Sequence, residues 1–83
     1  MAILKYPLAT EKAIKLIDYE NVITYIVDNR ATKTQIKKEF EKLFNVKVRK
    51  IRTANTPTNL KKAFLKLAPE YKATDISEKL KII

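Results

Sequence analysis

At 83 residues, with a formal net charge of +9 and no cysteine, histidine or glycine, the chain has the size of one domain, residues 1–83. The missing residue types exclude disulfides, the commonest metal ligands and general bases, and glycine-rich phosphate-binding loops. We therefore expect no enzyme, no catalytic residue, no metal and no cofactor. No apolar run is long enough for a transmembrane helix or a signal peptide, so we expect a cytoplasmic protein.

The first third of the chain predicts a strand, a helix and a second strand. Residues 2–6 are expected to form an edge strand, which Pro7 closes because its ring fixes its own φ. Thr10 can cap a short helix over residues 11–17. Residues 21–28 are β-branched or aromatic on both alternating faces, which is typical of a central strand covered on both sides.

The middle of the chain predicts an amphipathic helix. Thr32 followed by Gln35 is a capping box, and apolar residues then recur at helical spacing over residues 33–44. Asn45 falls where this helix should end. In a chain without glycine, asparagine is the usual residue for a positive φ at a helix terminus.

A β-hairpin is predicted next. Val46 and Val48 share one strand face, but Ile51 falls on the opposite parity. A bulge near Arg49 and Lys50 would restore the phase and return Ile51 to the apolar face. The sequence therefore predicts an irregular first strand.

The hairpin continues through a loop at residues 55–59 into a partner strand at residues 61–67, where apolar residues alternate with lysines. Pro69 ends this strand. In the tail, Thr74 can cap a last short helix that places Ile76 on an apolar side together with Leu80 and Ile83.

These elements predict an α+β fold. Its order is strand, helix, strand, helix, strand, strand and C-terminal tail. We expect a small, mainly antiparallel sheet of three to four strands covered by helices.

Positive charge is concentrated in residues 31–68, which hold eleven Lys or Arg residues and only two acidic ones, Glu39 and Glu41. The remainder holds seven basic and seven acidic residues, so the whole net charge of +9 belongs to this segment. Within it, residues 46–67 hold seven basic residues and no acidic one. Such a segment is typical of a nucleic-acid-binding protein, and the alternative is a solvated lysine-rich surface.

The hairpin supplies the candidate RNA contacts. Its basic side chains can follow a phosphate backbone, and polar side chains of its loop can form hydrogen bonds to RNA. The candidates are Lys47, Arg49, Lys50, Arg52, Asn55, Thr56, Asn59, Lys61, Lys62 and Lys66. The sheet aromatics Tyr25 and Phe64 are expected in the core, which favours folded RNA recognised by its shape and backbone over single strands stacked on aromatic rings.

Four segments resemble a known family. They are residues 7–13 (PLATEKA), 21–34 (NVITYIVDNRATKT), 44–56 (FNVKVRKIRTANT) and 61–67 (KKAFLKL). Together they resemble the large ribosomal subunit protein twenty-three family, in its archaeal form. The resemblance departs in the hairpin loop, where many members have glycine and this chain has Asn59.

The resemblance implies a non-catalytic protein of the large ribosomal subunit. It would bind the third domain of the large-subunit rRNA beside neighbouring ribosomal proteins, at the exit of the nascent-peptide tunnel, where the signal recognition particle and nascent-chain factors dock. By matching motifs, the RNA-facing positions would be Lys12, Lys33, Asn55, Thr56, Lys61 and Lys62. Glu11 would correspond to the acidic residue that docks a partner. The charge pattern alone leaves open a free-standing basic RNA-binding chaperone or regulator.

Overall fold

The structure is a computed structural model that describes residues 3–58 and 60–80. The four strands of these residues form one antiparallel sheet in the order β1-β2-β4-β3. The elements in chain order are β1 (Leu4–Pro7), α1 (Glu11–Glu20), β2 (Val22–Val27), α2 (Lys33–Phe44), β3 (Val48–Asn55), β4 (Lys61–Leu67) and α3 (Ala73–Lys79). The predicted α+β class, mainly antiparallel sheet and element order are confirmed.

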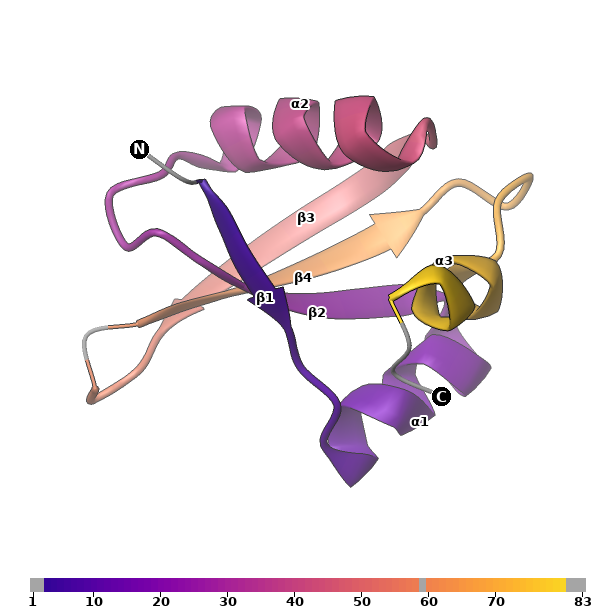
Figure 1. Ribbon diagram of the computed structural model, residues 1–83, viewed down its shortest axis with the longest axis horizontal. Coiled ribbons are helices and arrows are strands. Elements are labelled where there is room, and N and C mark those ends of the chain that lie inside the picture. Colours follow the sequence, from indigo (N-terminus) through magenta and orange to yellow (C-terminus); the bar gives the residue numbers. More distant parts are fainter. Residues whose placement is uncertain (1–2, 59, 81–83) are drawn as a thin grey trace.

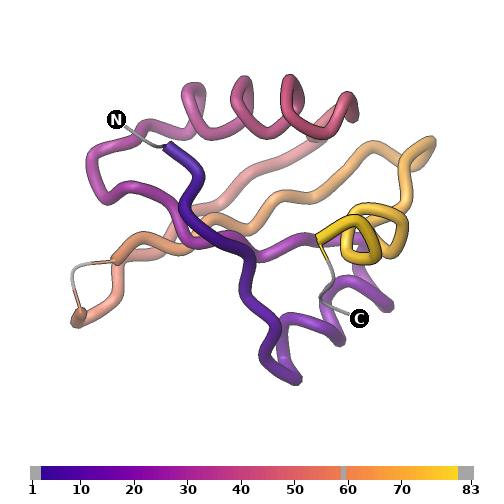
Figure 2. The backbone as a smooth tube through the Cα atoms, viewed as in Figure 1, coloured from indigo at the N-terminus to yellow at the C-terminus, as the bar shows by residue number. Residues whose placement is uncertain are grey.

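The helices lie around this sheet in a way that leaves part of one face open. Figure 1 shows α2 on one side of the sheet and α1 on the opposite side. The short helix α3 packs against α1 and β2. The hairpin of β3 and β4 carries its loop to one end of the longest axis of the molecule (Figure 2). Helix α1 packs on β2, whereas β4 and the edge strand β3 lie farther along the sheet.

The amphipathic helix α2 has the predicted bounds. Thr32 Oγ1 accepts a hydrogen bond from the backbone N–H of Gln35, and the Gln35 side chain accepts one from the N–H of Thr32, so the capping box is complete. Asn45 follows the helix with φ of 54°, in the left-handed region, as predicted. Local signals thus fix both ends of α2.

Helix α1 is longer than predicted. Thr10 Oγ1 accepts from the N–H of Ala13, which confirms the cap, but the helix continues to Glu20 instead of ending at residue 17. Asn21 stops it by adopting φ of 58°. The prediction that Asn21 starts the central strand is therefore wrong, because this residue is the left-handed helix cap and β2 begins at Val22.

The sheet edges differ slightly from prediction. Strand β1 begins at Leu4 and includes Pro7. Proline is tolerated here because β1 is an edge strand, where the N–H that proline lacks is not needed for pairing. Strand β3 begins at Val48 instead of Val46. Strand β4 has the predicted bounds, residues 61–67.

The predicted bulge is confirmed. Val48 pairs with Leu67, whereas Lys50 pairs with Lys66, so one extra residue, Arg49, lies in β3. The bulge places Val48 and Ile51 on the same face of the sheet, where both contribute to the core.

The last helix begins one residue before the predicted Thr74 cap. Its N-cap is Lys72, which makes no side-chain capping bond. Instead, Asn21 Oδ1 accepts a hydrogen bond from the N–H of Ala73 at 2.6 Å. Asn21, the residue that follows α1, thus supplies the capping hydrogen bond that Lys72 does not make. Ile76 is buried and Leu80 packs against the core, while the predicted contact of Ile83 lies outside the described residues.

The main core lies between α2 and the sheet. The rings of Tyr25 and Phe40 meet edge to face with centroids 6.2 Å apart, and Phe40 also lies against Phe44. Burial raises the pKa of the Tyr25 phenol. Tyr25 is therefore a core residue, as predicted. Among the described residues, no helix has the length and apolar character needed to cross a membrane.

Candidate nucleic-acid interface

The two faces of β4 have opposite chemistry. Ala63, Leu65 and Leu67 are at most 1% exposed and belong to the core beneath α2. Because successive side chains of a strand point to opposite faces, the residues between them lie on the other face. On that face β3 pairs Lys50 with Lys66, Arg52 with Phe64 and Ala54 with Lys62. We call this set of six residues the open face.

Positive charges lie close together on the open face. Lys50 is directly opposite Lys66 across the strand pair, an arrangement that is destabilising unless an anion compensates it. The guanidinium carbon of Arg52 lies 5.8 Å from the centre of the Phe64 ring, within the range of a cation–π contact. The open face therefore offers four cations, none of which forms an ion pair among the described residues, and one aromatic ring.

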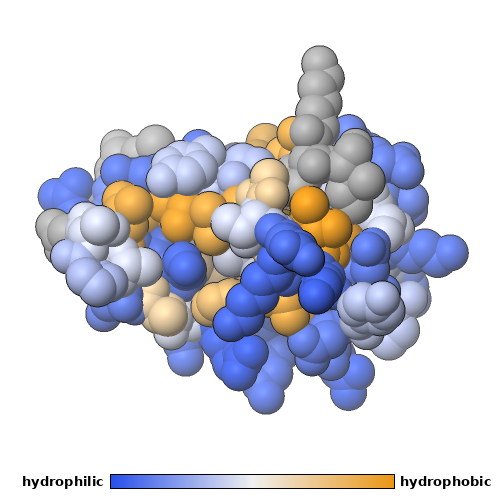
Figure 3. Space-filling view, turned by 90° about the horizontal axis from the view of Figure 1, so that it is seen from below, coloured by the Kyte–Doolittle hydropathy of each residue, from blue (hydrophilic) through white to orange (hydrophobic). Residues whose placement is uncertain are grey.

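Two hollows lie where the open face meets α1. They share Leu16 and Phe64, and we call them together the trough. The larger has a volume of about 210 Å³ and is lined by Leu16, Glu20, Val22, Lys50, Arg52, Phe64 and Lys66. The smaller has a volume of about 70 Å³ and is lined by Leu8, Thr10, Lys12, Ala13, Leu16, Thr24, Lys62 and Phe64. Seen from below, the surface toward the hairpin end shows an apolar patch with hydrophilic residues around it (Figure 3).

The trough brings together five of the predicted RNA-contacting residues. These are Lys12, Lys50, Arg52, Lys62 and Lys66. The two ion pairs of the described residues, Lys15 with Glu11 and Arg30 with Asp28, involve none of them. Glu20 is the single acidic residue of the lining. The trough is therefore a concave, strongly basic surface.

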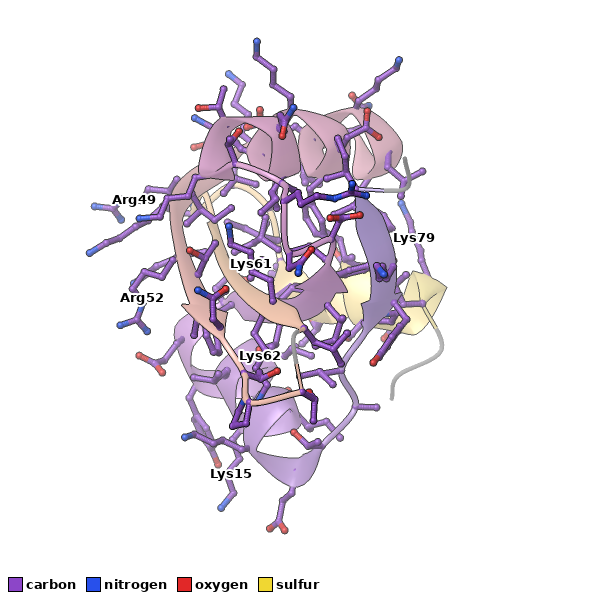
Figure 4. The ribbon with its side chains drawn as sticks, turned by 90° about the vertical axis from the view of Figure 1, so that its left-hand side faces the viewer. Lys15, Arg49, Arg52, Lys61, Lys62 and Lys79 are labelled. Carbon is purple, nitrogen blue, oxygen red and sulfur yellow. The ribbon has the colours of Figure 1, made fainter. Side chains whose placement is uncertain are left out.

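Other predicted residues lie elsewhere. Lys47 precedes β3 and lines a separate hollow with Lys37 and Tyr71. Arg49 is the exposed bulge residue, and it projects from β3 on the same side as Arg52 (Figure 4). Lys33 is exposed at the start of α2, on the other side of the sheet from α1.

Lys61 lies on the opposite side of the hairpin from its neighbour Lys62. Its Nζ donates a hydrogen bond of 2.7 Å to the carbonyl oxygen of Ala31, in the loop between β2 and α2. Figure 4 shows Lys61 toward α2 and Lys62 toward α1. The two adjacent lysines are therefore not brought to one surface.

The loop that receives Lys61 is itself held by Asp28. Its carboxylate accepts hydrogen bonds from the N–H of Arg30 at 2.8 Å and from the Arg30 guanidinium at 3.4 Å. These bonds, the backbone one first, hold the pKa of Asp28 below its ordinary value, with smaller help from the charges of Arg30 and Lys5.

The hairpin loop uses some of its polar groups internally. Asn55 is exposed at the end of β3. The Thr56 N–H donates to the carbonyl of Leu60, and Thr56 Oγ1 bonds with Leu60 and with Thr58 Oγ1. Asn59 lies outside the described residues. Thr56 therefore closes the loop, whatever else it binds.

Glu11 is exposed in the first turn of α1. Its side chain is 89% exposed, and its carboxylate is 3.9 Å from Lys15 Nζ. An exposed pair at this distance contributes little to stability. In the part of the chain that the structure describes, acidic side chains form no group of three that could hold a metal ion.

The prediction that Phe64 belongs to the core is wrong. The ring is half-buried on the open face and is not part of the core cluster. The strand alternation carried this signal, because Phe64 shares the parity of Lys62 and Lys66 and not that of Leu65. Sequence reasoning also missed Thr24, whose buried Oγ1 has no hydrogen-bond partner among the described residues.

Comparison with known proteins gives the family. A family model described as "Ribosomal protein L23" matches residues 2–76. A protein of Trypanosoma brucei brucei named large ribosomal subunit protein uL23 is 46% identical over 81 residues, which cover 98% of this chain and 49% of that protein. Its namesake in Tetrahymena thermophila is 46% identical over 82 residues, which cover 99% of this chain and 55% of that protein.

The chain therefore spans about half the length of the curated relatives that it matches. The resemblance that the four sequence segments carried extends over nearly the whole chain. Its archaeal form stays a prediction. The chain belongs to the ribosomal protein L23 family.

Proposed function

We propose that this protein is a structural, non-catalytic constituent of the cytoplasmic large ribosomal subunit and that it binds large-subunit rRNA through the trough. The observation that carries the proposal is the convergence on one concave face of five cations that form no ion pair within residues 3–58 and 60–80. The names of the two relatives assign those proteins to the large ribosomal subunit, which supports the same assembly for this chain.

Electrostatics supports RNA as the partner. Lys50 opposes Lys66 across the sheet, and a phosphate between them relieves their repulsion. The lysine side chains can reach phosphates of folded RNA without reading its bases. The proposed contact set remains Lys12, Lys33, Lys47, Arg49, Lys50, Arg52, Asn55, Thr56, Asn59, Lys61, Lys62 and Lys66. Within it the five trough cations carry most of the affinity, and Lys61 acts mainly by holding the Ala31 loop.

The proposal extends to the place of the protein within the large subunit. The family resemblance supports binding to the third domain of the large-subunit rRNA, next to neighbouring ribosomal proteins, at the exit of the nascent-peptide tunnel. There the protein would offer a docking surface to the signal recognition particle or nascent-chain factors. Glu11 supports this role because its carboxylate is exposed at the start of α1. Replacing Glu11 by Gln should reduce co-sedimentation of such a factor with ribosomes, and an unchanged amount contradicts the docking role.

Sedimentation of cell extract tests the assembly. Nearly all of the protein should travel with the large subunit. A variant with Lys50, Lys62 and Lys66 all changed to Glu should shift to the top of the gradient. The matched control changes Lys37, Lys38 and Lys42 to Glu, because these exposed residues of α2 alter the net charge equally. If the unaltered protein instead stays with other RNAs away from the subunit, it is the free-standing RNA-binding regulator.

A further inference from the structure

We propose that the trough holds an unpaired nucleotide of the RNA, with its base stacked on Phe64 and its flanking phosphates bound by the lysines at either end. This inference rests on the proposed RNA binding and names how the RNA is held there. It differs from recognition by RNA shape alone, because one aromatic ring becomes a stacking surface for a base.

Phe64 lies on the open face, within the trough. The ring lies between charged residues of the open face, outside the core cluster, and lines both hollows of the trough. An aromatic ring next to a guanidinium group is the arrangement that single-stranded RNA sites use, since every base has a face that can stack. The guanidinium group of Arg52 lies over the ring, with its central carbon 5.8 Å from the ring centre. A stacking base therefore takes the place of this guanidinium group on the ring face and leaves it to pair with a phosphate.

Lysines lie on both sides of Phe64 along β4, where they can meet the phosphates of a single strand. Lys62 and Lys66 flank Phe64 on the same face of β4, and four residues of a strand span about 13 Å. Lys12 lies beside Lys62 in the smaller hollow, and Lys50 lies opposite Lys66 in the larger one. Cations therefore lie on both sides of the Phe64 ring along β4. A single strand laid along β4 meets them with its phosphates and places one base between.

The two hollows of the trough are small. The larger hollow, with a volume of about 210 Å³, is smaller than pockets for drug-sized ligands, which begin at ~300 Å³, so it suits one flat ring system. Thr24 lies opposite Phe64 across β2 and β4, and both residues line the smaller hollow. An acidic peptide would satisfy the lysines but has no regular ring between its charges.

Binding of two RNA probes tests the inference. Fluorescence anisotropy is measured with a single-stranded oligoadenylate and with an RNA duplex of equal phosphate number, at one salt concentration. Phe64→Leu keeps an apolar side chain but removes the ring, and it should weaken oligoadenylate binding about tenfold. Duplex binding should change less than about twofold. Phe64→Tyr keeps the ring and should bind oligoadenylate like the unaltered protein. Circular dichroism melting checks that all variants fold.

A second measurement uses the unaltered protein. An oligonucleotide carrying 5-iodouridine is irradiated in the complex, and mass spectrometry should find the crosslink at Phe64, because this chemistry favours stacked aromatic side chains. Crosslinks found only elsewhere overturn the inference, as does equal oligoadenylate affinity of folded Phe64→Leu. A polyglutamate peptide that displaces oligoadenylate from the unaltered protein but not from Phe64→Leu also overturns it. If the unaltered protein binds neither RNA, the proposed rRNA binding itself fails; if only the dependence on Phe64 is missing, that proposal stands.

Discussion

Lys61 Nζ donates a hydrogen bond of 2.7 Å to the carbonyl oxygen of Ala31, while the adjacent Lys62 lines the trough on the other side of the hairpin. Two neighbouring lysines of the KKAFLKL segment therefore have different roles. One ties the hairpin to the loop that precedes α2, and the other belongs to the proposed RNA surface. A strand separates them because successive side chains alternate between its faces.

Single changes should separate these two roles. Lys61→Met should lower the free energy of unfolding by about 1 kcal/mol, because it removes a charged hydrogen bond to a backbone carbonyl, and it should leave RNA affinity within about twofold. Lys62→Met should leave stability unchanged and weaken RNA binding. Urea denaturation and a filter-binding assay measure the two effects. Equal losses of RNA affinity in both variants would refute the division of labour.

Asn21 should be among the most sensitive positions of the fold. Asn21→Ala should cost about 3 kcal/mol, because alanine disfavours the left-handed conformation and the hydrogen bonds to Ala73 and Tyr71 are lost. Asn21→Gly should cost less, since glycine accepts this φ. As a control, Asn45→Ala changes a left-handed cap for which no such tertiary bonds are seen among the described residues, and it should cost about 1 kcal/mol. Equal costs at both positions, measured by urea denaturation, contradict the role of Asn21.

RNA affinity should depend strongly on salt. If about six basic groups neutralise phosphates, the logarithm of the association constant should fall with the logarithm of the salt concentration with a slope of about −5. Changing Lys50, Lys62 and Lys66 to Gln should reduce the slope to about −2 or −3. Titrations of a large-subunit rRNA fragment at several salt concentrations measure this. A slope near zero is incompatible with the proposed interface.

Asp28 makes stability depend on acid pH. Its pKa is lowered in the folded protein, so its carboxylate stabilises the fold above its ordinary pKa of 3.8, and this contribution is lost as the pH falls through the folded value. Asp28→Asn keeps the turn geometry but removes the charge. At neutral pH it should lower the Tm. Below pH 3.8 the gap between the two proteins should close. A gap that stays constant from neutral pH to acid would count against this linkage.

Local signals explain which parts of the fold the sequence predicts. The capping box of Thr32 and Gln35, with Asn45 at the other end, determines both bounds of α2 from neighbouring residues alone. The alternation of residues 61–67 and the parity change at the bulge likewise lie within one strand. Such features need no knowledge of distant contacts, so they can be predicted.

The errors come from distant contacts. Asn21 is compatible with a strand or with a helix cap, and it becomes a cap where its side chain reaches Tyr71 and Ala73, about fifty residues away in the chain. The start of α3 depends on the same bonds. In the candidate site, the cationic residue types were predictable. The bond of Lys61 to Ala31 depends on how the elements pack, whereas the place of Phe64 outside the core follows from the alternation of β4.

Lysine acetylation of the protein, free and within purified large subunits, tests the central claim most directly. Mass spectrometry reports how strongly each lysine is protected in the subunit. The trough lysines Lys12, Lys50, Lys62 and Lys66 should become strongly protected, whereas Lys37, Lys38 and Lys42 on α2 should react at rates close to those of the free protein. Protection confined to the α2 lysines, with the trough still reactive, would contradict binding of rRNA through the open face.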